Sequence, residues 1–147
     1  MSKFENIQNK EKFVLMLNEA LRYEYTDFFS YRRESMLFKE KIVNGEKLEE
    51  EFLTLSNTEL LHADIIANKI LDYGIEPLWN IGNIYISNSL KETLTHHLET
   101  ESMIYKFYDE LLNLCPDQNF TIILQGIQQN EKKHFERIKY LISKIKY

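Results

Sequence analysis

Acidic residues stand inside the apolar stripes of this chain, and this placement restricts the folds open to it more than any other feature. Apolar residues recur every three or four positions, as on one face of a helix, through four long segments. Each stripe has one glutamate near its middle: Glu24, Glu59, Glu101 and Glu131. Because a buried carboxylate without compensation is very costly, the four helices need a shared source of positive charge.

Helix-breaking residues divide the chain into these four segments. The sequence has only four Gly and two Pro among 147 residues, which favours an all-α chain of long helices over many short strands. Capping residues and breakers predict helices over about 9–43, 46–73, 89–115 and 117–147. Asn9, Ser89 and Asp117 are the expected N-caps of the first, third and fourth helices. Gly74 is the glycine expected at the C-terminal end of the second helix.

The connections between these helices predict their topology. The turns at Asn44-Gly45 and at Pro116 are very short, so each joins an antiparallel hairpin. Residues 74–88 lack a helical pattern, and about 15 extended residues reach about 50 Å, more than the roughly 40 Å of a 27-residue helix. They can therefore cross a bundle from end to end. We expect a single domain, residues 1–147, that folds as a four-helix bundle of ferritin-like topology, with two hairpins and one long crossover.

The four glutamates are expected at one level of this bundle, because they lie at matching heights when counted from the helix ends. Two of them begin Glu-x-x-His motifs, Glu59 to His62 and Glu131 to His134, and residues i and i+3 share a helix face. Two such motifs with one glutamate from each remaining helix form the ligand pattern of a di-iron carboxylate site. Two divalent cations balance four carboxylates, whereas the alternative, a metal-free bundle, has to place the same acids together without that balance.

At these residues the chain resembles bacterioferritin and, more loosely, rubrerythrin. Leu17 to Glu24 with Tyr31 is similar to the first helix of a bacterioferritin, and the motifs of its other three helices are matched by residues 59–64, 98–101 and 131–134. The resemblance covers about residues 12–145. It implies that two ions are bound, one by Glu24 and His62 and the other by Glu101 and His134, with Glu59 and Glu131 as bridges.

Three departures from these families change the expected function. Bacterioferritins have a haem-ligating Met directly after the second-helix glutamate, and here that residue is Leu60, so no haem is expected. The sequence ends soon after His134, without the fifth helix that lines bacterioferritin cage channels, so a 24-subunit storage shell is not expected. The additional third-helix glutamate of rubrerythrins is Ile104 here, and their four-cysteine domain is absent.

Residues beside the predicted ligands are further candidates. Tyr31, two turns after Glu24, is expected to hydrogen-bond a ligand or donate an electron, and the alternative is a core aromatic with a satisfied hydroxyl. Tyr105, one turn after Glu101, is a weaker candidate of the same kind. Asp27 is either an additional acid near the metals or the partner of an arginine at the rim. His96 and His97 are adjacent, so at most one faces inward, and we expect both at the surface or the rim.

Charge, hydropathy and cysteine content make nucleic-acid-binding, membrane-spanning and disulfide-stabilised proteins unexpected. The formal net charge is −5 and the basic residues are scattered, so no nucleic-acid partner is expected. The N-terminus is polar, and no apolar run is long enough to span a membrane. A single cysteine, Cys115, cannot form an internal disulfide, which suits the reducing cytoplasm.

We therefore expect an oxidoreductase, a di-iron carboxylate oxidase that reacts Fe(II) with O2 or H2O2. It would act as a ferroxidase or as a peroxide- or oxygen-reducing enzyme like rubrerythrin, with two Fe ions per chain or with Mn, and its electron donor is unknown. The alternatives are a di-iron oxygenase for an organic substrate, which bulky Tyr and Phe disfavour, and a non-enzymatic iron or manganese binding and storage protein. Apolar residues of the crossover predict a homodimer or small homo-oligomer: Leu78, Trp79, Ile81 and Tyr85.

Overall fold

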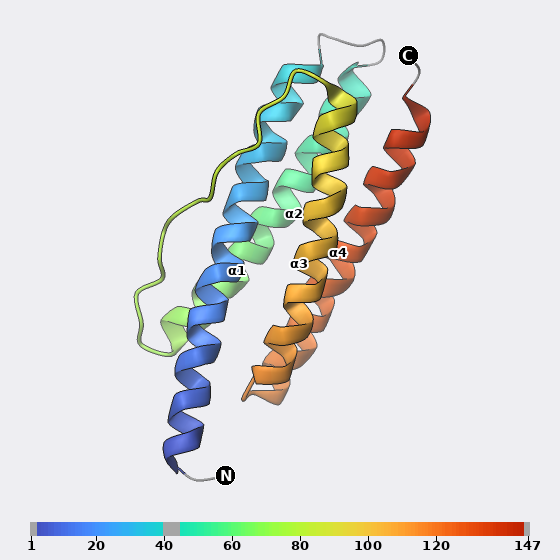
Figure 1. Cartoon of the computed structure of the whole chain (residues 1–147). Helices are drawn as coiled ribbons and strands as arrows, with labels where there is room; N and C mark the ends of the chain where they lie inside the picture. Colours follow the sequence, from blue (N-terminus) through green and yellow to red (C-terminus); the bar gives the residue numbers. More distant parts are fainter. Residues whose placement is uncertain (1–2, 40–44, 146–147) are drawn as a thin grey trace. The chain divides into compact units, whose positions relative to one another are not determined.

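The computed structural model describes residues 3–39 and 45–145, which form four α-helices and no strand (Figure 1). The helices are α1 (Lys3–Phe38), α2 (Gly45–Asp72), α3 (Leu90–Leu114) and α4 (Gln118–Lys144). They belong to two compact units. We call Asn18–Ile86 the α1–α2 unit, and Met1–Leu17 together with Ser87–Tyr147 the α3–α4 unit.

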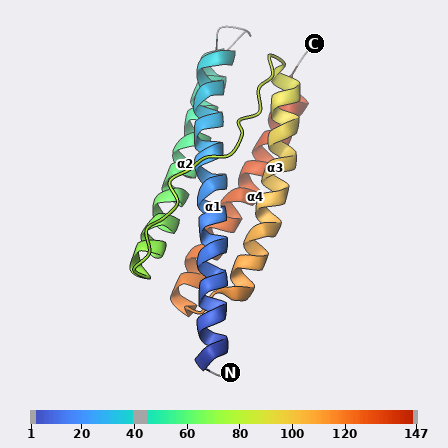
Figure 2. The same ribbon diagram turned by 60° about the vertical axis from the view of Figure 1, so that its left-hand side comes forward.

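The α1–α2 unit is a helical hairpin with a continuous apolar face. Figures 1 and 2 show the two helices running side by side. The ring of Tyr31 on α1 stacks on that of Phe52 on α2, with centroids 6.1 Å apart. The other buried apolar side chains of this unit include Leu21, Phe38, Leu55, Ile66 and Ile70. The apolar stripes of α1 and α2 therefore form the core of the hairpin, in which Ile70 is buried and Tyr73, one turn later, is only half-buried.

The segment that follows α2 is extended and runs along α1 in the same direction (Figure 2). The Leu78 amide donates to Asn18 Oδ1 at 2.9 Å, and the Gly82 amide donates to Thr26 Oγ1 at 2.7 Å. Eight residues of helix and four extended residues each span about 12–13 Å, so these contacts fit an extended strap. A Cβ atom at Gly82 would lie 3.3 Å from Thr26 Oγ1, which shows how closely the segment approaches α1.

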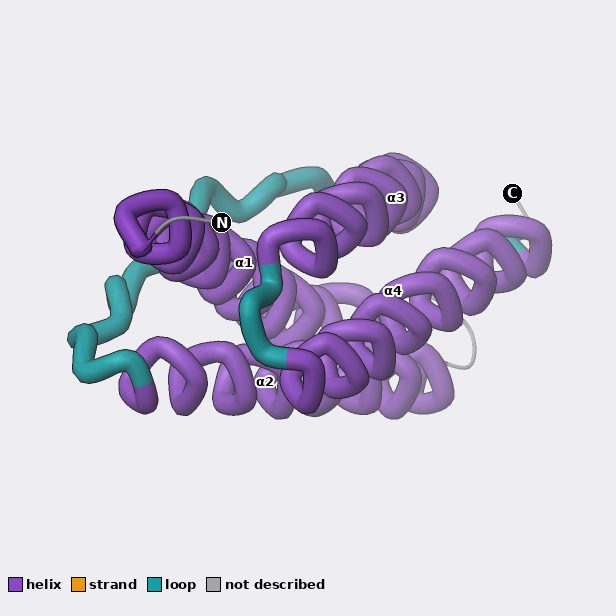
Figure 3. The backbone as a smooth tube through the Cα atoms, turned by 90° about the horizontal axis from the view of Figure 1, so that it is seen from below, coloured by secondary structure: helices purple, strands orange, loops and turns teal. Residues whose placement is uncertain are grey.

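The α3–α4 unit is a second hairpin, whose helices are joined by the short turn visible in Figure 3. Helix α3 packs against α4 through buried apolar side chains. At the turn end, Phe13 of α1 contacts Phe120 edge-to-face, with an interplanar angle of 83°. On α3 the buried face passes through Ile104 and Leu111, whereas the next residue in each case, Tyr105 and Leu112, is only half-buried.

Most of the predicted helix ends are confirmed. Ser89 accepts a hydrogen bond from the Glu92 amide at 3.2 Å, and Asp117 Oδ1 accepts from the Asn119 amide at 2.9 Å, so both are N-caps. Gly74 has φ of +78°, the left-handed conformation that ends α2. Helix α3 stops before Pro116, as expected.

Both limits of the first predicted helix are wrong. Helix α1 begins at Lys3, so Asn9 lies inside it and is not a cap. The residues before Asn9 contain neither Gly nor Pro, so nothing stops the helix from continuing toward the N-terminus. At the other end α1 stops at Phe38 rather than near Val43, and the predicted break at Asn44 lies outside the described residues. None of the four helices described is long and apolar enough to cross a membrane.

Candidate metal centre

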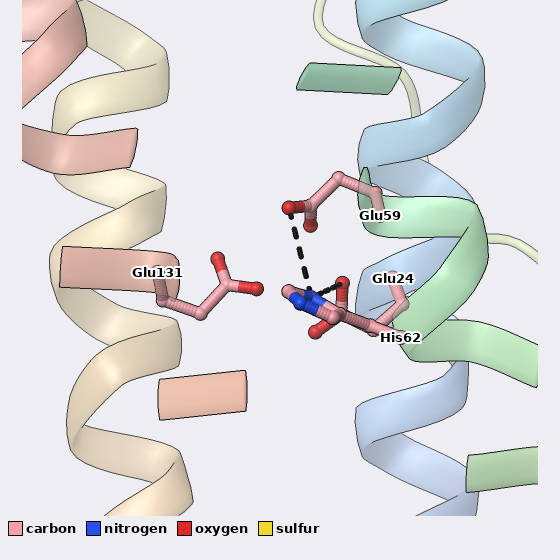
Figure 4. A group of neighbouring side chains, drawn as sticks. All are labelled: Glu24, Glu59, His62 and Glu131. Atoms are coloured by element: carbon pink, nitrogen blue, oxygen red, sulfur yellow. Dashed lines mark ion pairs between the residues drawn. The ribbon is translucent and has the colours of Figure 1, made fainter. Parts of the chain in front are cut away.

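The α1–α2 unit brings three predicted ligands together. Glu59 and His62 lie three residues apart on α2 and so project from the same face, and Glu24 projects toward them from α1. The Nδ1 atom of His62 lies 3.4 Å from Glu24 Oε2 and 3.9 Å from Glu59 Oε1. Figure 4 draws both contacts as dashed lines. All three residues are buried, and the two carboxylates are fully inaccessible.

The α3–α4 unit contains a second trio of the same construction. Here α3 supplies Glu101, and α4 supplies Glu131 and His134 as a Glu-x-x-His pair. The Nδ1 atom of His134 lies 3.8 Å from Glu101 Oε1 and 3.9 Å from Glu131 Oε2. Both carboxylates are again fully buried and the imidazole is 7% exposed. Glu131, which Figure 4 also labels, belongs to this trio.

The distances within each trio suit ligands of a metal ion better than partners in direct hydrogen bonds. Nitrogen–oxygen hydrogen bonds are typically about 2.7–3.2 Å long, shorter than any of the four His–Glu distances above. Two ligand atoms that each lie about 2.1 Å from one ion stand about 3–4 Å apart, and within each trio the candidate ligand atoms are within 4.8 Å of one another. The oxygen-rich donor set with one imidazole suits Fe or Mn.

The structure shows the burial of four residues that were predicted to lie beside the ligands. Tyr31 is fully buried in the core of the α1–α2 unit, and Asp27 is 4% exposed on the same face of α1 as Glu24. His97 is buried, so its predicted place at the surface is wrong: its position one turn before Glu101 turns it inward. His96 is half-buried beside it, and burial together with the neighbouring His97 imidazole lowers the pKa of His96.

Several buried polar residues were not predicted. Ser56 and Gln128 lie one turn before the Glu-x-x-His motifs of α2 and α4, and each bonds to the backbone of the partner helix. Glu34 is 1% exposed on α1, and the buried hydroxyl of Thr93 lies on α3. Each of them lies at an inward-facing position of the apolar period of its helix, which is a signal of burial. Polar residues such as serine and glutamine in a helix are, however, usually expected to face solvent.

Comparison with known proteins identifies a ferritin-like domain. The family model for the ferritin-like domain matches residues 14–147. A ferritin-like, diiron-carboxylate protein from Bacillus anthracis str. Ames has a TM-score of 0.85 and 21% identity, with 97% of this chain and 99% of that chain covered. A comparison with curated proteins gives no match.

Two bacterioferritins also share the fold. The Desulfovibrio desulfuricans protein, described in different catalytic states of its diiron site, has a TM-score of 0.83 and 18% identity over 94% of this chain and 82% of that chain. The Rhodobacter capsulatus protein, with a metal-free dinuclear site and a haem iron, has a TM-score of 0.81 and 26% identity over 90% and 84% of the two chains. The predicted ferritin-like four-helix fold is confirmed, and the chain belongs to the ferritin-like domain family.

Proposed function

We propose that the two trios together hold one pair of iron ions and that the protein is a di-iron carboxylate oxidase that reacts Fe(II) with O2 or H2O2. The observation that carries this proposal is the repetition of one buried construction, a glutamate on one helix and a Glu-x-x-His pair on the next, in both units. Two divalent ions would balance the four carboxylates. The diiron-carboxylate description of the Bacillus anthracis protein supports the same type of centre.

Within this proposal each trio supplies one ion with its terminal ligands. Glu24 and His62 would hold one ion, and Glu101 and His134 the other. The first glutamate of each Glu-x-x-His motif, Glu59 or Glu131, would bridge the two ions. Carboxylates are hard anionic donors that stabilise Fe(III), and they can change between terminal and bridging coordination as the charge on iron changes.

The iron ions, when bound, would supply two one-electron reducing equivalents as Fe(II) becomes Fe(III). The chain's contribution is to hold the ligands in a buried environment that excludes bulk water and strengthens electrostatic interactions. Tyr31, buried two turns from Glu24 and stacked on Phe52, is proposed to hydrogen-bond a ligand or to donate a further electron. With H2O2 the balance is two Fe(II), one peroxide and two protons giving two Fe(III) and two waters.

Iron is proposed over manganese because the named structural relatives are diiron proteins, and no haem is proposed because Leu60 cannot ligate one. The oxidase is proposed to act in the cytoplasm, where the lone thiol of Cys115 stays reduced.

Self-association is proposed through the linker face, which we define as Leu78, Trp79, Ile81 and Tyr85. These residues are 38–57% exposed in the isolated chain, and Trp79 also contacts Tyr25 of α1. A two-fold dimer would cover this apolar surface, and such dimers are the commonest closed assemblies. Light scattering is expected to give a dimer or small oligomer, and a particle of about 24 chains would favour the storage function instead.

The oxidase proposal is tested by anaerobic loading with Fe(II) followed by one pulse of H2O2 or O2. We expect each chain to bind two Fe(II) and one peroxide to oxidise both of them. Glu101→Gln should abolish the paired oxidation, whereas Glu99→Gln, a matched change at an exposed position of the same helix, should not. A wild-type chain that binds Fe(II) but oxidises it no faster than free Fe(II) would refute the oxidase and leave the metal-binding alternative.

A further inference from the structure

Two hydrogen bonds between helices recur at equivalent places in the two hairpins. In the α1–α2 unit, Ser56 Oγ donates to the Phe28 carbonyl at 3.0 Å. In the α3–α4 unit, Gln128 Nε2 donates to the Tyr105 carbonyl at 2.9 Å. In both cases a side chain on the second helix of the hairpin reaches the backbone of the first helix. We call these two bonds the register clamps.

The clamps stand at the same offsets from the proposed ligands. Ser56 lies three residues before Glu59, and Phe28 lies four residues after Glu24. The same two offsets separate the donor and the acceptor of the other clamp from the two glutamates of its own hairpin. Each clamp therefore ties its two helices together about one helical turn, roughly 5 Å, from the level of the glutamates.

Both donors are placed unusually for polar residues within a helix. Ser56 is 0% exposed and Gln128 is 5% exposed, and buried polar groups are costly unless they are hydrogen-bonded. A buried serine in a helix commonly bonds its own helix, as Ser35 does by donating to the Arg32 carbonyl. A bond to the neighbouring helix instead resists sliding or rotation of one helix against the other, the movement that would separate a glutamate from the Glu-x-x-His pair opposite it.

The two clamps differ in strength. The Ser56 hydroxyl has one hydrogen and makes one bond across its hairpin. The amide of Gln128 has two N–H groups, and its Nε2 atom also donates to Asp109 Oδ1 at 2.7 Å. Because hydrogen bonds to charged groups are stronger than neutral ones, the clamp of the α3–α4 hairpin is stronger than the clamp of the α1–α2 hairpin.

We propose that Ser56 and Gln128 are positioning residues, each of which sets the helix register of one metal half-site. The proposal rests on the proposed function only in that each trio binds a metal. Ser56 holds Glu24 opposite Glu59 and His62. Gln128 holds Glu101 opposite Glu131 and His134, and its removal has the larger effect.

Variants in which only one of the two trios is intact separate the role of Ser56 from that of Gln128. His134→Ala leaves the α1–α2 trio intact, and His62→Ala leaves the α3–α4 trio intact. Anaerobic titration with Co(II), followed by its visible absorption, then measures one affinity at a time. Ser56→Ala is expected to weaken Co(II) binding about tenfold in the His134→Ala protein and less than twofold in the His62→Ala protein. Gln128→Met, which keeps the volume and removes both donors, should show the reverse pattern with a larger loss.

Matched variants distinguish a positioning role from a general loss of stability. Ser35→Ala removes a buried hydroxyl that bonds only its own helix, and Ser56→Thr keeps the donor, so both should bind Co(II) as well as their parent proteins. Thermal melting of each metal-free variant checks that it is folded. Equal losses in the two backgrounds, no loss in either, or the same loss with Ser35→Ala would overturn the proposal. Parent proteins that bind no Co(II) would refute the proposed metal sites themselves.

Discussion

The two hairpins carry the same ligand trio in different surroundings. In the α1–α2 unit, the position three residues after the first-helix glutamate is Asp27, a buried acid, whereas the matching position of the α3–α4 unit is Ile104, a buried apolar residue. One half-site therefore has an additional carboxylate within one turn of its ligands. Under the proposed function, the two trios would share one chemistry, and these neighbouring positions would make the two ions inequivalent.

The register clamps extend this difference. The α3–α4 hairpin is fixed by an amide with two bonds and the α1–α2 hairpin by a hydroxyl with one. Under the proposed function, the half-site with the additional acid and the weaker clamp would change its coordination more easily than the other half-site.

Removing one histidine is expected to have the largest effect. His62→Ala and His134→Ala should each reduce tightly bound metal from two ions per chain to one, because each removes the only nitrogen ligand of its trio. Elemental analysis after gel filtration measures the stoichiometry. If either variant still retains two ions, that histidine is not a ligand, and the equivalence of the two trios is lost.

Metal removal is expected to be the next largest effect. A ligand present at 100 times its Kd stabilises the folded state by about 2.7 kcal/mol per site, so two ions should add about 5 kcal/mol. Calorimetric melting of the metal-free and Mn(II)-loaded protein should show a rise of about 10–20 °C in Tm. If the metal-free protein melts at the same temperature, the buried carboxylates are compensated without metal.

Neutralising one carboxylate should separate metal binding from folding. Glu101→Gln is expected to raise the free energy of unfolding of the metal-free protein by about 2 kcal/mol, because it removes one of the buried like charges. The same change should weaken one metal site. Denaturant unfolding with and without metal measures both effects, and Glu99→Gln, at an exposed position, serves as the matched control.

Asp27→Asn should have the smallest effect and should act on one hairpin only. We expect a gain of about 1 kcal/mol in the metal-free protein, with a weaker ion in the α1–α2 half-site and no change in the other. Co(II) titration of the variant in the two single-histidine backgrounds resolves the two sites. Equal weakening of both would show that Asp27 does not distinguish the hairpins.

The sequence predicts the helices and the two Glu-x-x-His pairs because both depend on local spacing. Glu-x-x-His places two donors on one face whatever surrounds the helix, and Ser89, Asp117 and Gly74 act through their own backbone neighbours. These features do not require knowledge of tertiary contacts, and the family comparisons confirm the resulting fold.

The parts that sequence analysis missed depend on contacts between helices. Ser56 has a role only because the Phe28 carbonyl of the neighbouring helix lies within reach, and its position in the apolar period of α2 indicates burial but does not identify that partner. The burial of His97, in contrast, has a local signal that was missed, because His97 lies one turn before the buried Glu101 on the same face of α3. The early start of α1 reflects a preceding segment without breakers rather than a capping signal.

The central claim, that the two trios hold one coupled pair of ions, is tested most directly by the Mössbauer spectrum of protein loaded with two ⁵⁷Fe(II) per chain and then oxidised. Two Fe(III) ions bridged by carboxylates couple magnetically, so the account predicts a diamagnetic ground state at low temperature and no electron paramagnetic resonance signal from isolated Fe(III). Two magnetically independent Fe(III) ions, or a single ion per chain, would contradict the claim.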